Sequence, residues 1–118
     1  MKNFLLFVLF VSVQFAYAQI ETKSIKEFTG FNKATEVLLD VRTVEEFNEG
    51  CIDGALNIDW FSQDFNKQVA SIDKNKTIYV YCKIGGRSLK SQARLKELGF
   101  LHVINLDGGY DLWSSANK

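Results

Sequence analysis

Several residue types are missing or scarce in this chain of 118 residues. Proline is absent, so turns must depend on Gly, Asn and Asp. The two cysteines, Cys51 and Cys82, are not enough for a disulfide scaffold, although a bond between them stays open. The single histidine, His102, gives no support to a cysteine–histidine catalytic pair. Basic and acidic residues balance at 14 each and form no basic run, so no nucleic-acid or membrane-surface partner is indicated.

The N-terminal segment has the features of a signal peptide. Lys2 precedes an almost wholly apolar run at residues 4–13, and residues 16–18 (Ala-Tyr-Ala) form the pattern of a cleavage site. A membrane anchor would need about 20 apolar residues, whereas this run breaks off at Gln14. We therefore expect removal of residues 1–18 and an exported protein, periplasmic or secreted, without a membrane anchor.

The remaining residues, 19–118, are enough for one compact domain. Two continuous apolar runs, at 37–41 and 78–82, are typical of strands buried on both faces, and weaker runs lie at 55–58 and 102–106. Helical patterns alternate with these runs. Strands that alternate with helices predict an α/β domain whose parallel sheet is covered on both faces.

Four helices are expected between and after the strands. Thr43 and Glu46 fit a capping box that opens the first helix. Apolar residues at helical spacing predict a helix over 60–72. A third helix over 87–98 ends at Gly99, and a short last helix covers 111–116.

The segment "CKIGGRS" follows a predicted central strand, where α/β sheets bind ligands. A loop between a strand and a helix presents backbone N–H groups without helical partners. Two glycines allow these donors to converge near the Cys82 sulfur, and Lys83 and Arg87 add positive charge. All of this favours the thiolate, which is the nucleophilic form. A buried cysteine that only packs is the plainer alternative, but packing needs neither the glycines nor the arginine.

With these motifs the sequence resembles the single-domain rhodaneses. The resemblance rests on "LLDVRTVEEFNEGCIDGALNI", "YVYCKIGGRSLKSQARLKELGF" and "VINLDGGYDLW". It implies a rhodanese-like domain over 19–118, with a three-layer α/β/α fold around a five-stranded parallel sheet. It also implies thiosulfate sulfurtransferase activity without a metal or cofactor.

In that chemistry Cys82 attacks the outer sulfur of a small anionic donor such as thiosulfate and becomes a persulfide. Cyanide or a thiol then accepts the sulfur. The resemblance implies that backbone amides cradle the persulfide and the anionic group of the donor, and that two of the side chains attract the donor. The residues concerned are Lys83, Ile84, Gly85, Gly86, Arg87 and Ser88.

Other positions are expected to support the site. Asp40, at a strand end, should bond nearby backbone donors, and Arg42 should pair with Glu46 four residues later. Gly108 and Gly109 are expected to form a tight turn beside the cysteine loop.

The chain departs from the family where relatives commonly carry histidine and proline, because Cys51 and Asp53 stand there. In an oxidising compartment Cys51 is a candidate redox partner, which could trap Cys82 as a disulfide or resolve its persulfide.

Two other functions compete with sulfur transfer. A cysteine phosphatase uses a similar amide cradle closed by an arginine, but its loop is usually one residue longer than the span from Cys82 to Arg87. A non-catalytic or redox binding module would have the same fold, but the retained cysteine and its basic neighbours favour the enzyme.

Overall fold

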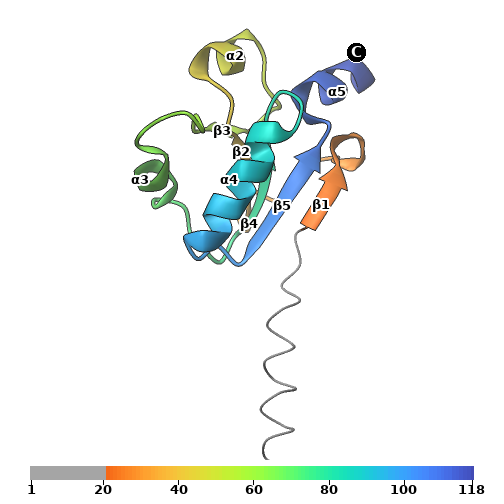
Figure 1. The fold of residues 1–118 in the computed structure, drawn as a ribbon. Helices are drawn as coiled ribbons and strands as arrows, with labels where there is room; N and C mark the ends of the chain where they lie inside the picture. Colours follow the sequence, from red (N-terminus) through yellow and green to blue (C-terminus); the bar gives the residue numbers. More distant parts are fainter. Residues whose placement is uncertain (1–20) are drawn as a thin grey trace, which may run out of the picture.

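The computed structural model describes residues 21–118, and their fold is built on a five-stranded sheet (Figure 1). All neighbouring strands are parallel, in the order β1-β5-β4-β2-β3. The strands are β1 (Glu21–Ser24), β2 (Glu36–Asp40), β3 (Leu56–Asn57), β4 (Thr77–Tyr81) and β5 (His102–Asp107). The helices are η1 (Ile25–Glu27), α2 (Val44–Glu49), α3 (Phe65–Val69), α4 (Gly86–Glu97) and α5 (Gly109–Ala116). The predicted α/β fold with five parallel strands is confirmed.

The central strand, β4, lies between β2 and β5, with Val80 opposite both Leu39 and Asn105. Ile78 and Val80 are fully buried. Because both faces of this strand are covered, its sequence is apolar without alternation. This burial fixes the position at which the chain leaves the sheet, immediately before Cys82.

Each face of the sheet has its own apolar cluster. On one face, Val80 and Cys82 pack with Phe65 and Val69 of α3 and with Leu95 of α4, within a larger group. On the other face, side chains of the sheet pack with η1 and α5, and this cluster contains Ile25, Phe28, Leu38, Ile52, Tyr81 and Leu106. The sheet is therefore the middle layer of three, as expected.

The expected helix over 60–72 is wrong in extent, because only Phe65–Val69 is helical. Before it, the Asp59 carboxylate accepts from the Phe61 N–H at 2.9 Å, and the Ser62 hydroxyl accepts from the Asp64 N–H at 3.1 Å. Such local side-chain bonds satisfy backbone donors without a helix.

The predicted signal peptide, residues 1–18, lies outside the described residues. Within 21–118, no helix is long and apolar enough to cross a membrane.

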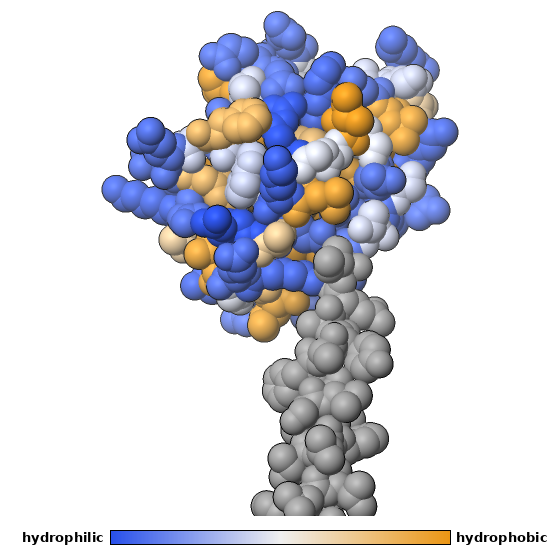
Figure 2. All heavy atoms as spheres, viewed as in Figure 1, coloured by the Kyte–Doolittle hydropathy of each residue, from blue (hydrophilic) through white to orange (hydrophobic). Residues whose placement is uncertain are grey.

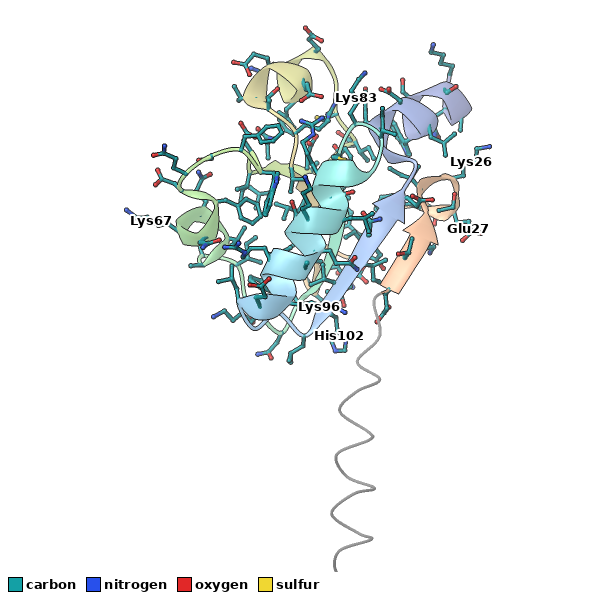
Figure 3. All side chains as sticks on the ribbon, in the orientation of Figure 1. Lys26, Glu27, Lys67, Lys83, Lys96 and His102 are labelled. Atoms are coloured by element: carbon teal, nitrogen blue, oxygen red, sulfur yellow. The ribbon has the colours of Figure 1, made fainter. Side chains whose placement is uncertain are left out.

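His102 begins β5, at the end of the sheet opposite Lys83 (Figure 3). Seen from the side of α4, the surface is mostly hydrophilic, with apolar groups in scattered patches (Figure 2).

Candidate functional site

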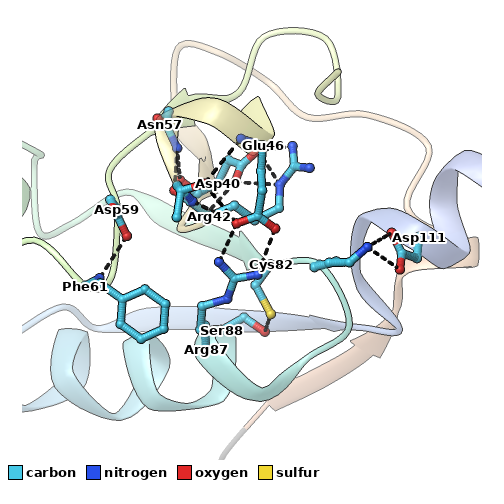
Figure 4. A network of polar contacts seen from close by, with 12 residues as sticks. Asp40, Arg42, Glu46, Asn57, Asp59, Phe61, Cys82, Arg87, Ser88 and Asp111 are labelled. Carbon is cyan, nitrogen blue, oxygen red and sulfur yellow. Dashed lines mark hydrogen bonds and ion pairs between the residues drawn. The ribbon is translucent and has the colours of Figure 1, made fainter. Parts of the chain in front are cut away.

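Cys82 lies at the carboxyl end of β4 and is 1% exposed. Its thiol contacts the Ser88 hydroxyl, with 3.5 Å between Sγ and Oγ (Figure 4). The same hydroxyl donates to the carbonyl oxygen of Gly85 at 3.0 Å. One buried serine thus joins the sulfur to the middle of the loop that follows it.

Residues 82–88, here called the cysteine loop, surround a small pocket above the thiol. The pocket has a volume of about 320 Å³ and is lined by Cys82, Lys83, Ile84, Gly85, Gly86, Arg87 and Lys90. Among the hydrogen bonds within residues 21–118, none uses a backbone N–H of residues 83–88 as its donor. Since α4 begins at Gly86, its first N–H groups also have no helical acceptor. The loop therefore offers free backbone donors to an anion.

Most of the residues predicted to bind the substrate lie around this pocket. Five of the six predicted substrate-binding residues line the pocket together with Cys82. Ser88, the last residue of the loop, is instead buried, does not line the pocket and touches the sulfur. Lys90 also lines the pocket, although it was not among the predicted residues. Its spacing of three residues from Arg87, within one helix, was the available indication.

The turn at Gly108 and Gly109 supports the cysteine loop from behind, as predicted. The Tyr110 N–H donates to the Cys82 carbonyl at 2.8 Å, and the Asp111 N–H donates to the Lys83 carbonyl at 3.1 Å. Gly109 has a φ of +67°, and a Cβ atom there would lie 2.7 Å from the Cys82 carbonyl oxygen and closer still to that of Lys83. Only glycine fits this close approach of two backbones.

Arg87 does not point freely into the pocket, because Glu46 of α2 holds it in a two-pronged ion pair. Nη1 lies 2.7 Å from Oε1 and Nη2 lies 3.0 Å from Oε2. The hydrogen bonds from Arg87 lower the pKa of Glu46 from 4.5 to about 2, and the same bonds raise the pKa of Arg87. The Arg87 guanidinium also lies 5.7 Å from the ring centre of Phe61.

The expected pair between Arg42 and Glu46 is wrong, because Arg42 pairs with Asp40. Arg42 Nη2 lies 2.7 Å from Asp40 Oδ2, and both side chains are almost fully buried. Asp40 also accepts from the Arg42 N–H at 2.9 Å, which agrees with its predicted backbone role. Burial opposes the charge of Arg42, but the hydrogen bonds and charge of Asp40 prevail and raise its pKa.

This buried pair supports the site from the side. The Arg42 guanidinium donates to the Gly50 carbonyl at 2.7 Å and stacks 4.3 Å from the ring centre of Tyr110. Tyr110 is the residue whose N–H holds the Cys82 carbonyl. The pair therefore connects the end of β2 to the turn behind the cysteine loop.

Cys51 is a free, half-buried thiol, and Cys82 is also free. Burial raises the pKa of the Cys51 thiol. The next residue, Ile52, belongs to the cluster on the opposite face from Cys82, and its N–H donates to the Tyr81 hydroxyl at 3.1 Å. The resolving role of Cys51 remains a prediction, which a thiol count with and without reductant tests.

The chain resembles known proteins over most of its length. The family model for the rhodanese-like domain matches residues 21–116. "Protein HIGH ARSENIC CONTENT 1, mitochondrial" of Arabidopsis thaliana is 36% identical over 107 residues, which cover 82% of this chain and 63% of that protein. "Thiosulfate sulfurtransferase GlpE" of Shewanella oneidensis is 32% identical over 95 residues, covering 80% of this chain and 92% of that protein. The crystal structure of SSP1007 from Staphylococcus saprophyticus superposes with a TM-score of 0.69 at 28% identity, covering 80% of this chain and 93% of that one. This chain thus spans less than two thirds of the Arabidopsis protein.

Proposed function

The chain belongs to the rhodanese-like domain family, and on that premise we propose that it is a sulfurtransferase that works through a persulfide on Cys82. The observation that carries the proposal is the position of the thiol below a pocket formed by its own loop. The free N–H groups of residues 83–88 suit both a bound anion and a negatively charged persulfide. The relative from Shewanella, named a thiosulfate sulfurtransferase, supports the same activity.

The proposed first step is displacement at the outer sulfur of thiosulfate. The Cys82 thiolate forms a bond to this sulfur, and the sulfur–sulfur bond of the donor breaks. Sulfite leaves with the bonding electron pair, and the enzyme carries the negative charge on the terminal sulfur of the persulfide. A pocket of about 320 Å³ is at the small end of ligand sites and suits such a compact donor.

The second step returns the enzyme to its starting state. Cyanide, or the thiolate of an acceptor, attacks the terminal sulfur of the persulfide and the bond to Cys82 breaks. The products are thiocyanate, or the persulfide of the acceptor, and the Cys82 thiolate. The free amides of the loop can hold the negative charge at Cys82 in both steps.

The mass of the intact protein before and after thiosulfate tests this proposal. Wild type and Cys51→Ser should each gain one sulfur atom, and Cys82→Ser should gain none. Added cyanide should remove the gain and release an equal amount of thiocyanate. If the wild-type protein gains no sulfur although a thiol assay shows that Cys82 is reduced, the proposal is overturned, and a phosphatase or a binding module is favoured.

We further propose that the domain acts after export, because its N-terminal sequence has the features of a signal peptide. N-terminal sequencing of the protein from a periplasmic or secreted fraction should begin at Gln19. A chain that retains Met1 in the cytoplasmic fraction would contradict export without affecting the sulfurtransferase proposal.

A further inference from the structure

We infer that Lys90 recognises the anionic end of the sulfur donor, an inference that rests on the function proposed above. Three cationic side chains line the pocket over Cys82, namely Lys83, Arg87 and Lys90. A small dianion is attracted by positive charge that protein carboxylates have not already neutralised. The ion pairs of these three residues therefore decide which one is available.

Two of the three cations are already paired. Lys83 Nζ lies 3.1 Å from Asp111 Oδ2 and 3.3 Å from Oδ1. Both terminal nitrogens of the Arg87 guanidinium donate to the Glu46 carboxylate, Nη1 to Oε1 at 2.7 Å and Nη2 to Oε2 at 3.0 Å. Since Glu46 has a pKa of about 2, it stays ionised throughout the neutral range.

Lys90 differs from both in having no carboxylate within ion-pair distance among residues 21–118. Its side chain is exposed, and it follows Arg87 by three residues in α4, which places both on one side of the helix. Its ammonium group can therefore turn toward the pocket without breaking another contact. Lys90 is therefore the cation lining this pocket that no carboxylate of residues 21–118 neutralises.

Two further carboxylates, those of Asp59 and Asp107, lie near the loop. Asp59 acts electrostatically on Arg87 in addition to Glu46. Asp107 lies close to the loop, with Oδ1 3.7 Å from the place of a Cβ atom on Gly85. Arg87 and Lys83 each have acidic neighbours, whereas Lys90 has no ion pair among residues 21–118, so an approaching anion gains most from its ammonium group.

Alkylation of Cys82 tests this inference without any sulfur transfer. Iodoacetate and iodoacetamide form the same sulfur–carbon bond and release iodide, but only iodoacetate is an anion. In a Cys51→Ser background, Lys90→Met should lower the ratio of the iodoacetate rate to the iodoacetamide rate about fivefold. Lys90→Arg should keep the ratio. Lys67→Met, on the exposed side of α3 away from Lys83, is the matched control for loss of one positive charge and should also keep it (Figure 3).

Kinetics with thiosulfate then connect Lys90 to the donor. Lys90→Met should raise KM for thiosulfate about fivefold with little change in kcat, and the effect should fade at high ionic strength. An unchanged alkylation ratio and an unchanged KM would overturn the role of Lys90. If wild-type protein takes no sulfur from thiosulfate, the proposed function fails, and the alkylation ratio still tests whether Lys90 attracts anions.

Discussion

The carboxylate of Glu46 on α2 meets the guanidinium of Arg87 on α4 edge to edge, with 2.7 and 3.0 Å between the paired atoms. Glu46 also completes the capping box at the start of α2, where its Oε1 accepts from the Thr43 N–H at 3.1 Å. The carboxylate of Glu46, which helps to cap the start of α2, thus also neutralises the charge of Arg87 in the cysteine loop. This pairing lowers the net positive charge at the pocket over Cys82.

Removing the charge of Glu46 should strengthen the use of anionic donors. Glu46→Gln keeps an amide oxygen for the capping box but leaves Arg87 without its counter-ion. We expect KM for thiosulfate to fall about threefold to fivefold. Glu45→Gln, on the same helix but exposed, is the control and should change KM little. A rise in KM for Glu46→Gln would mean that the pair instead positions Arg87 for the donor.

The same residue predicts a loss of stability in acid. The pKa of Glu46 falls from 4.5 to about 2 on folding, so the unfolded chain binds more protons between these values and stability decreases as pH drops from 4.5 to 2. We expect the pair to contribute about 1 kcal/mol above this window. Urea unfolding at several pH values, compared with Glu46→Gln, measures the difference. Parallel curves for the two proteins across this window would contradict the pairing.

The sequence was sufficient to predict the elements whose patterns are local. The apolar runs at β2 and β4 predict buried strands, and the capping box at Thr43 and Glu46 is present as expected. Strand β1 has the sequence ETKS, which is polar and mostly exposed. Its pairing with β5 comes from main-chain bonds at the sheet edge, which leave no pattern in the side chains.

Contacts between distant residues could not be predicted in the same way. Arg42 and Glu46 have the spacing of a helical ion pair, but Arg42 precedes α2 and faces Asp40. The partner of Glu46, Arg87, is 41 residues away, and only the tertiary fold brings the two side chains together. The position of Cys82 was predictable, but the ion pairs of Lys83 and Arg87, and the lack of one for Lys90 among residues 21–118, were not.

Ser88 should be needed for reaction at Cys82 beyond its part in folding. Ser88 and Ser91 are both buried on α4, and each donates to a backbone carbonyl, that of Gly85 at 3.0 Å and that of Arg87 at 2.8 Å. Alanine at either site should cost about 1 kcal/mol of stability. Only Ser88→Ala also removes the contact with the sulfur, so its rate of persulfide formation should fall about tenfold. Equal rates for Ser88→Ala and Ser91→Ala would contradict a direct role.

The buried pair of Asp40 and Arg42 should show strong coupling in stability. Arg42→Met leaves the carboxylate of Asp40 buried without its counter-ion, and we expect a loss of about 3–5 kcal/mol. The double variant Asp40→Leu with Arg42→Met removes both charges and should recover most of that loss. Chemical unfolding of the single and double variants measures the coupling. Losses that simply add would show that the pair acts as two independent groups.

Gly109 should be required for the shape of the cysteine loop. Gly109→Ala costs about 1–2 kcal/mol for its left-handed backbone and also drives a methyl group into the carbonyls of Cys82 and Lys83. Gly99→Ala separates the two effects, because Gly99 also has a positive φ, of +97°, but its Cβ would meet only Lys74 Cδ, at 3.7 Å. We expect Gly99→Ala to lose stability but to form the Cys82 persulfide at the normal rate, and Gly109→Ala to lose both. If Gly109→Ala reacts normally with thiosulfate, the turn behind the loop does not hold Cys82 in its reactive position.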